Sequence, residues 1–335
     1  MIIPEPLERF TFETARLMEE HPPRIRDENK QIVFDIACPR DSSCAGEIGY
    51  SRWPTFPLPE RIAPAAILNA RMEGKAGIFD YEPVADMPGA IEWHVNFADP
   101  RLFAGYGTSL FAQDEMQAAE HPALGALVEA LRDGGHPAVT ETADGPTPVL
   151  VMGVERRCHV ATDKDADAGR PRGLYGNEFA LAPADAVRVA TRRIEPPTIT
   201  NFIAMAAPAY GFGPYTRETI EHVLQTAYTG FAAAVAESAR VAGPDTPVVI
   251  HTGFWGCGAF GGDRVLMTVL QLVAAGMTDV DRLVFHTAKK RGGPPFAEAV
   301  TIVRDELGAG GEVDSVRLLD HILAMGFEWG MSDGH

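Results

Sequence analysis

The residue types best suited to chemistry in this chain gather in one glycine-rich run, TGFWGCGAFGGD, at residues 252–263. A short apolar run precedes it at 248–250, and apolar residues with helical spacing follow it at 265–275. The order of strand, glycine loop and helix is typical of a phosphate-binding loop. Glycine lets backbone N–H groups approach an oxyanion, and the helix N-terminus adds partial positive charge. The run does not end in the Lys-Ser/Thr pair of a Walker A loop. Its two phenylalanines, Phe254 and Phe260, favour a ribose or a base stacked beside a diphosphate.

The same glycines also spell G-x-G-x-x-G from Gly256 onwards, which is the dinucleotide fingerprint of dehydrogenases. That fingerprint requires an acidic residue about 20 positions further on, at the end of the next strand. Asp279 and Asp281 lie at about this distance, but they precede the next apolar run, at 283–285. They would therefore stand at the wrong end of that strand. Hydride transfer with NAD remains an alternative, disfavoured by this placement.

A second run lies upstream, where HVNFAD at 94–99 is followed by FAGYGTSLFAQDE at 103–115. The first segment alternates in the manner of a strand, and the second leads through two glycines to the triplet Gln113-Asp114-Glu115. Carboxylates in the first turn of a helix are stabilised by the helix dipole, so this triplet alone predicts no more than a helix start. Cleavage of a ribose-linked glycosidic bond, however, requires a carboxylic acid that protonates the leaving oxygen and then activates water.

Together and in this order, the two runs resemble the poly(ADP-ribose) glycohydrolases of the vertebrate type, which are built on a macrodomain. The run at 252–263 is similar to the family's diphosphate loop, except at Phe254, where the family commonly has Asn. In the upstream run, Gly105-Tyr106-Gly107 stands for the family's triple glycine, and Gln113-Asp114-Glu115 stands for its acidic triplet. A weaker match, GLYGNEF at 173–179, resembles the tyrosine that closes over the substrate. An ordinary loop tyrosine at a turn is the alternative there.

The resemblance implies a role for each matching residue. Glu115 is expected to be the catalytic general acid and base, and Asp114, the second acid of the catalytic pair, is expected to position it. We further expect these residues to bind substrate: Asn96 and Asp99 near ribose hydroxyls, Gly105, Tyr106, Gly107, Gln113, Tyr175, Phe254, and Gly256, Cys257, Gly258, Ala259, Phe260 and Gly261 around the diphosphate and distal ribose. Asn96 and Asp99 stand exchanged relative to the family pattern, and Asp114 replaces a Glu.

The roles of three further aromatic or cysteine residues in or near these motifs are also predicted. Cys257 is either a nucleophile or, as we favour, a small residue that lets the backbone approach phosphate. Phe285 is a candidate for stacking on adenine, with a core aromatic on a strand as the alternative. Trp255 is expected in the core.

The composition limits the partners. The net charge is −17, which disfavours a basic nucleic-acid-binding face and favours end-acting cleavage or a mono-ADP-ribosylated substrate over a grip on a long polyanion. The four cysteines do not form a disulfide framework, and the ten histidines form no zinc motif, so we predict no metal and no cofactor. There is neither a bilayer-length apolar run nor a signal-peptide pattern, so a cytoplasmic location and no membrane partner are expected.

Strands and helices alternate along the chain, which predicts an α/β fold. The candidate strands are 91–97, 149–154, 199–206, 248–250 and 283–285. The candidate helices are 7–18, 62–72, 112–131 with a break at 121–122, 216–240, 296–307 and 313–325. With the resemblance, we expect a macrodomain-like three-layer fold with a mixed central sheet. Its catalytic core would be 76–290, with an N-terminal extension (1–75) wrapped around it and C-terminal helices (291–335) packed on it.

The predicted activity is hydrolysis of ribose glycosidic bonds in poly(ADP-ribose) or in ADP-ribosylated protein or nucleic acid, with release of ADP-ribose. The alternatives are a non-catalytic ADP-ribose-binding macrodomain, a mono-ADP-ribosyl hydrolase, and the NAD-dependent oxidoreductase. Glu115 argues against a pure binding module, because such a module has no use for an acid at the reacting bond.

Overall fold

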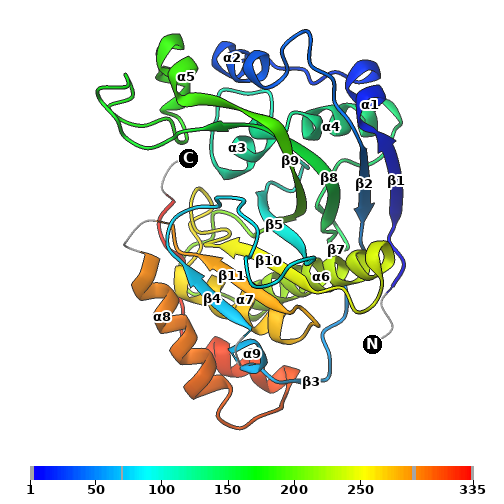
Figure 1. Ribbon diagram of the computed structural model, residues 1–335. Helices are drawn as coiled ribbons and strands as arrows, with labels where there is room; N and C mark the ends of the chain where they lie inside the picture. The colour runs from blue at the N-terminus through cyan, green and yellow to red at the C-terminus, as the bar shows by residue number, and fades with distance from the viewer. Residues whose placement is uncertain (1–3, 69–70, 289–291, 333–335) are drawn as a thin grey trace.

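A computed structural model describes residues 4–68, 71–288 and 292–332. Its centre is an eight-stranded sheet, seen obliquely in Figure 1. In the order in which they lie side by side, the strands are β1 (Glu8–Glu13), β2 (Glu47–Arg52), β8 (Val149–Val160), β9 (Thr191–Ala206), β5 (Ile91–Ala98), β10 (Val248–Gly253), β11 (Arg282–His286) and β4 (Met72–Lys75). The pairs from β1 to β9 are antiparallel, and those from β9 to β4 are parallel. The sheet is therefore mixed, as predicted.

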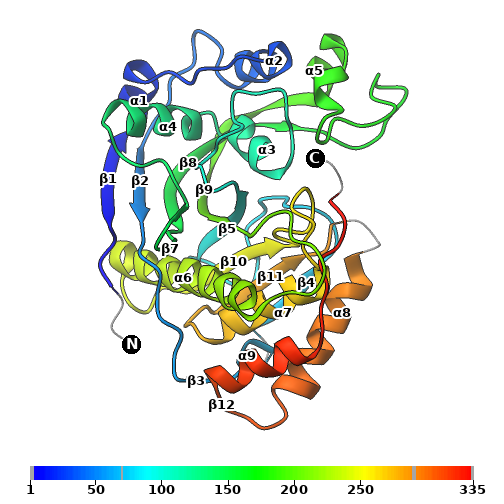
Figure 2. The ribbon, with the colours of Figure 1, turned by 180° about the vertical axis from the view of Figure 1, so that it is seen from behind.

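Helices cover both faces of the sheet, which gives the predicted three layers. One face carries α6 (Arg217–Ala242) and α7 (Arg264–Gly276), which lie in front of the sheet in Figure 2. The other face carries α3 (Gln113–Glu120) and α4 (Ala123–Asp133). Side chains of β5 alternate between these layers: Trp93 donates a hydrogen bond to Ser238 of α6 (2.9 Å), and Asn96 reaches α3.

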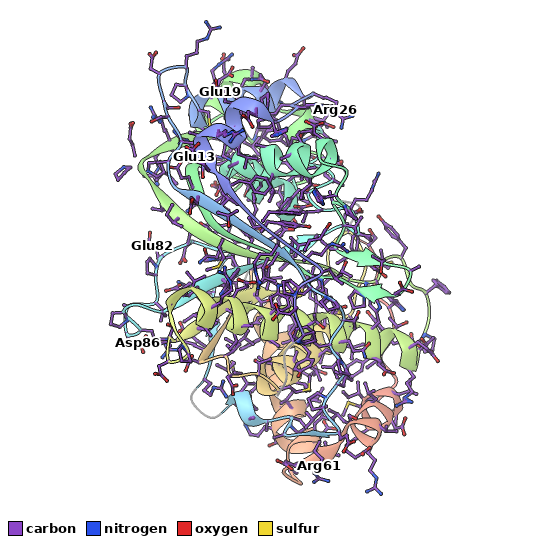
Figure 3. All side chains as sticks on the ribbon, turned by 90° about the vertical axis from the view of Figure 1, so that its right-hand side faces the viewer. Glu13, Glu19, Arg26, Arg61, Glu82 and Asp86 are labelled. Atoms are coloured by element: carbon purple, nitrogen blue, oxygen red, sulfur yellow. The ribbon has the colours of Figure 1, made fainter. Side chains whose placement is uncertain are left out.

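The remaining elements lie at the ends and edges of the sheet. They are the helices α1 (Thr14–Glu20), α2 (Glu28–Ala37), α5 (Ala184–Ala190), α8 (Gly293–Thr301) and α9 (Ser315–Ala324), the single 3-10 turns Ala66–Leu68 and Phe179–Leu181, and the short π-helical segment Ile302–Leu307. Two small ribbons pair β3 (Arg61–Ile62) with β12 (Val313–Asp314) and β6 (Glu141–Thr142) with β7 (Gly145–Pro146). The side view in Figure 3 separates two ends, with Glu19 and Arg26 at one end and Arg61 at the other. No helix within the described ranges is both long and apolar enough to cross a bilayer.

The segment before residue 76 contributes strands to the main sheet. The helix predicted at 7–18 is wrong for its first half, because 8–13 form the edge strand β1, whose side chains alternate in burial, and α1 begins only at Thr14. The helix predicted at 62–72 is also wrong: Ala66–Leu68 form a single 3-10 turn and Met72 begins β4, while 69–70 lie outside the described residues. Short apolar runs are compatible with both the helical and the strand period, and in both segments the pairing of β1 and β4 with neighbouring strands determines the structure.

The later helices agree better with the sequence. The break at 121–122 separates α3 from α4. The long helix α6 begins as predicted, with the Thr216 hydroxyl accepting a hydrogen bond from the backbone N–H of Thr219. Of the segment 291–335, the described part contains α8, packed against α7, and α9, packed against α6.

Candidate active site

The two sequence runs meet at one edge of the sheet. β5 and β10 are parallel neighbours, with His94 opposite His251, so the loops after both strands leave at the same edge. At that edge a Cβ atom on Gly253 would lie 3.5 Å from the ring of Phe97. The glycine loop and the loop that leads to α3 therefore begin side by side, where ligands bind in open α/β sheets.

Glu115 occupies the third position of α3 and is buried. Its Oε2 accepts a hydrogen bond from the backbone N–H of Ala112 (3.0 Å). Its side chain lies directly against Gly105, where an added Cβ would stand 2.9 Å from the carboxyl carbon and closer still to Oε1. Within the described part of the chain, Oε1 accepts no hydrogen bond. This carboxylate is thus held by one oxygen, and only glycine at position 105 leaves room for it.

Asp114 points in a different direction from Glu115, as expected for neighbours at a helix start. Its Oδ1 accepts a hydrogen bond from the side-chain amide of Asn96 (2.9 Å), which also donates to Gln117 (2.8 Å). Burial, followed by the nearby charge of Glu115, raises the pKa of Asp114 to about 8. Asn96 itself is completely buried, so the predicted ribose contact is corrected: Asn96 lies behind Asp114 and supports it.

Gln113 bonds the first turn of α3 to the strand beside it. Its Oε1 accepts from the backbone N–H of Phe97 (2.8 Å), and its Nε2 donates to the carbonyl of Val95 (3.0 Å). Both ends of the amide are occupied by β5, which fits a positioning role. Asp99, just past this strand, is half exposed and accepts from the backbone N–H of Arg101 (3.0 Å).

The middle residue of Gly105-Tyr106-Gly107 faces away from the site. The Tyr106 hydroxyl donates to Glu129 of α4 (2.6 Å) and accepts from the backbone N–H of Arg24 (2.9 Å). The carbonyl of Gly107 accepts from the backbone N–H of Arg26 (2.9 Å). The prediction of a substrate contact by the Tyr106 side chain is therefore corrected. It ties the loop to the N-terminal segment, and this explains how a bulky residue replaces a glycine there.

Lys30 is a site residue that the sequence reasoning missed. It lies on α2, is 2% exposed, and donates from Nζ to the carbonyls of Gly105 (2.8 Å) and Tyr106 (3.1 Å). Burial lowers its pKa to about 8, against the opposing effect of Glu115 and Asp114. One signal was present in the sequence, since Lys30 shares the inner face of α2 with Val33. A lysine on an apolar helix face requires a buried partner.

The glycine loop has the geometry of an oxyanion cradle. Gly256 and Gly261 adopt positive φ (75° and 73°), a conformation that favours glycine. Two hydrogen bonds close the loop, from the backbone N–H of Gly261 to Gly258 (3.1 Å) and of Gly262 to Gly256 (2.9 Å). Within the described residues, the backbone N–H groups of Gly258, Ala259 and Phe260 reach no protein acceptor. Three successive donors are thus available for an oxyanion just before the N-terminus of α7.

The side chains of the loop divide into core and rim. Trp255 is buried and donates to the carbonyl of Met205 (2.9 Å), as expected of a core residue. Cys257 is also buried, and burial raises the pKa of its thiol, which agrees with a small spacer rather than a nucleophile. Phe260 is half-buried on the rim, with its ring centroid 5.9 Å from that of Tyr210.

Phe254 and Phe285 pack together at the base of the glycine loop, edge to face with centroids 5.2 Å apart. Phe285 is completely buried and stacks on Phe296 (4.9 Å). Phe285 is therefore a core aromatic residue, which was the alternative, and the prediction that it stacks on adenine is corrected.

The tyrosine loop at 173–179 lies next to the acid-bearing helix. Phe111 and Gly176 exchange backbone hydrogen bonds (2.9 and 3.3 Å), and the ring of Phe111 stacks on Phe179 (4.0 Å). Tyr175 is 39% exposed beside this bridge. The structure thus brings all three sequence matches to the same edge of the sheet.

An acid-bearing helix and a glycine loop on a three-layer α/β sheet define a macrodomain-like class of protein. Residues 173–292 match the family model described as poly(ADP-ribose) glycohydrolase, macro domain fold. The match over these residues agrees with the family recognised in the sequence. The matched range includes the tyrosine and glycine loops. Glu115 lies outside it.

Similar proteins include poly(ADP-ribose) glycohydrolase 1 of Caenorhabditis elegans, which is 53% identical over 34 residues, or 10% of this chain and 4% of that protein. Among solved structures, the glycohydrolase from Thermomonospora curvata is 14% identical, with a TM-score of 0.40 over 88% of this chain and 85% of that one. The same enzyme bound to the inhibitor ADP-HPD is 19% identical, with a TM-score of 0.44 over 72% and 83%. The enzyme from Deinococcus radiodurans in complex with ADP-ribose is 11% identical, with a TM-score of 0.39 over 89% and 95%. Similarities of this size carry no residue roles to this chain.

Proposed function

We propose that this protein hydrolyses ribose glycosidic bonds of poly(ADP-ribose) or of ADP-ribosylated targets and releases ADP-ribose. The observation that carries the proposal is the position of Glu115. Its carboxylate is buried, accepts a hydrogen bond through Oε2 and lies against Gly105. The loop that carries it leaves the sheet beside the glycine loop, where three backbone N–H groups have no acceptor among the described residues. A module that only binds ADP-ribose requires the donors but not the acid.

The mechanism follows from these groups. The N–H groups of the glycine loop hold the diphosphate, which places the adjoining ribose over the first turn of α3. Glu115 gives its proton to the leaving oxygen as the ribose becomes oxocarbenium-like, then takes a proton from the attacking water. Asp114 faces Asn96, so it supports the helix start and does not share the proton of Glu115.

The decisive experiment measures ADP-ribose release from a poly(ADP-ribosyl)ated protein by wild type and by Glu115→Gln. We expect the variant to lose at least about 10²-fold in rate, because general acid–base catalysis contributes on this scale, and to keep its affinity for ADP-ribose. The matched control is Glu19→Gln, an exposed residue on α1 that is labelled in Figure 3. Binding without release by wild type would favour the non-catalytic reader. Equal release by wild type and Glu115→Gln would assign the acid elsewhere.

The substrate form is the finer part of the proposal. The net charge of −17 favours attack at chain ends or on single ADP-ribose units, because a strongly acidic surface repels a long polyanion. We expect only free ADP-ribose as product and a KM that depends weakly on salt. Oligomeric products with a steep salt dependence would contradict end-acting cleavage. The ADP-ribosylated partner is proposed to be a protein or a nucleic acid, and the location cytoplasmic, which cell fractionation tests.

A further inference from the structure

The glycine loop is held from outside by the loop that joins β9 to α6, residues 207–216. The backbone N–H of Tyr210 donates to the carbonyl of Phe260 (3.1 Å). The Tyr215 hydroxyl accepts from the backbone N–H of Asp263 (2.9 Å), the residue that caps the N-terminus of α7. The hydrogen bonds within the glycine loop set its shape, whereas these two bonds fix the position of its second half.

A segment that follows α9 packs on this connecting loop. We call residues 326–332 the strap, and in Figure 2 it is the red trace that runs upward from α9. The backbone N–H of Trp329 donates to the carbonyl of Gly213 (2.9 Å), and that of Tyr215 donates to the carbonyl of Phe327 (3.0 Å). The strap therefore pairs with the connecting loop in the manner of a short antiparallel strand.

The indole of Trp329 fastens the strap in place. Its ring centroid lies 4.4 Å from that of the buried Tyr215, and the two ring planes are nearly parallel (11°). A Cβ atom added to Gly211 would overlap the indole, so only glycine leaves room for it there. Beyond the indole, the strap reaches the glycine loop directly, because a Cβ atom on Gly261 would stand 3.2 Å from the carbonyl oxygen of Gly330. Trp329 thus stacks on the side chain that bonds the start of α7.

We propose that Trp329 and Tyr215 are positioning residues that hold the glycine loop ready for a diphosphate. The stacked indole orients the Tyr215 ring, and the Tyr215 hydroxyl holds the N–H of Asp263 at the start of α7. A loop that is fixed before its ligand arrives loses less conformational freedom on binding. Because Glu115 lies on the other loop, both residues should govern affinity and not the proton transfer. This inference rests on the proposed function, which supplies the diphosphate.

Trp329→Ala tests the strap through the split between binding and turnover. We expect calorimetric affinity for ADP-ribose to fall about tenfold, which is the factor that one aromatic pair is worth, while kcat stays near wild type. Trp329→Phe keeps a ring on Tyr215 and should restore most of the affinity. The matched control is Met331→Ala, an exposed side chain on the same strap. Wild-type affinity in a folded Trp329→Ala, or a loss confined to kcat, would overturn the proposal.

Tyr215→Phe separates the hydroxyl from the ring. The variant keeps the stack with Trp329 and removes the acceptor of the Asp263 N–H, so affinity should fall about fivefold, the factor that one neutral hydrogen bond is worth. An affinity equal to that of the wild type would contradict the role of the hydroxyl.

Hydrogen exchange of the free protein tests the same link without any ligand. The N–H groups of Gly261 and Gly262 are bonded within the glycine loop, so their exchange reports its opening. Peptides covering 256–263 should exchange faster in Trp329→Ala and Tyr215→Phe than in wild type or Met331→Ala. Faster exchange in a protein whose wild type binds no ADP-ribose would support the link but contradict the proposed function. Unchanged exchange in both variants, with normal binding by wild type, would overturn the positioning role alone.

Discussion

The loop that carries the acid and the glycine loop leave the same edge of the sheet, but they are stabilised differently. The glycine loop is closed by its own backbone hydrogen bonds, and the groups proposed to bind the diphosphate are its backbone N–H groups. The acid loop depends on distant parts of the chain: Lys30 binds the carbonyl of Gly105, and Asn96 binds Asp114. A site made of backbone is specified by a local motif, whereas a side-chain acid requires support from several elements.

Gly105→Ala is expected to disturb only the loop that carries the acid, and to have the largest effect on the rate of ADP-ribose release. An added methyl group would overlap the Glu115 carboxylate and displace it. A displacement on the order of 1 Å costs about 10² in rate, while ADP-ribose affinity should stay near wild type because the glycine loop is untouched. Turnover and calorimetric binding measure the two effects. Gly49→Ala is the control, since its Cβ would meet only Met152 at 3.8 Å. Equal losses of rate and affinity would mean that the two loops do not act separately.

Asp114→Asn tests how much stability the protein loses when the buried Asp114 carboxyl group ionises. The folded-state pKa of Asp114 is raised to about 8, above the unfolded value of 3.8, so folding favours its protonated form. Its contribution to stability is present at low pH and is lost as pH rises from about 4 to about 8. The wild type should therefore lose on the order of 2 kcal/mol of unfolding free energy from this group between pH 6 and 8, and Asp114→Asn should not. Urea denaturation across this range measures it. Parallel pH profiles for both proteins would show that Asp114 ionises normally.

Gly256→Ala reverses the comparison by acting on the glycine loop alone. The position has a positive φ of 75°, and an added Cβ would stand 2.6 Å from that of Ala207. We expect affinity for ADP-ribose to fall on the order of tenfold, from strain of about 1–3 kcal/mol that shifts the loop. The rate at saturating substrate should change less than in Gly105→Ala. A variant that binds normally but turns over slowly would place this loop in the chemistry rather than in binding.

The same contrast separates what the sequence revealed from what it left hidden. The glycine loop, the α/β alternation and the start of α6 follow from local patterns, since glycine, apolar spacing and a Thr cap act within a few residues. Lys30 and Gly105 are 75 positions apart, so no spacing rule relates them. The interior position of Asn96 and the strand β1 likewise depend on pairing with distant segments. Tyr106 stands in a matching motif, yet its partners, Arg24 and Glu129, lie outside the motif.

Tyr106→Phe tests whether Tyr106 stabilises the fold through these partners, and its expected effect is the smallest of the four variants. The variant keeps the ring but removes the hydroxyl that donates to Glu129 and accepts from the N–H of Arg24. Glu129 retains ion pairs with Arg132 and Arg24, so the loss should be about 1–2 kcal/mol of stability rather than loss of folding. Thermal unfolding measures it, and the kcat and KM for ADP-ribose release should remain near wild type. A large rise in KM with unchanged stability would return Tyr106 to the substrate-binding role that the motif suggested. Unchanged kinetics with lower stability would show that the family's middle glycine can be replaced where the loop faces away from the ligand.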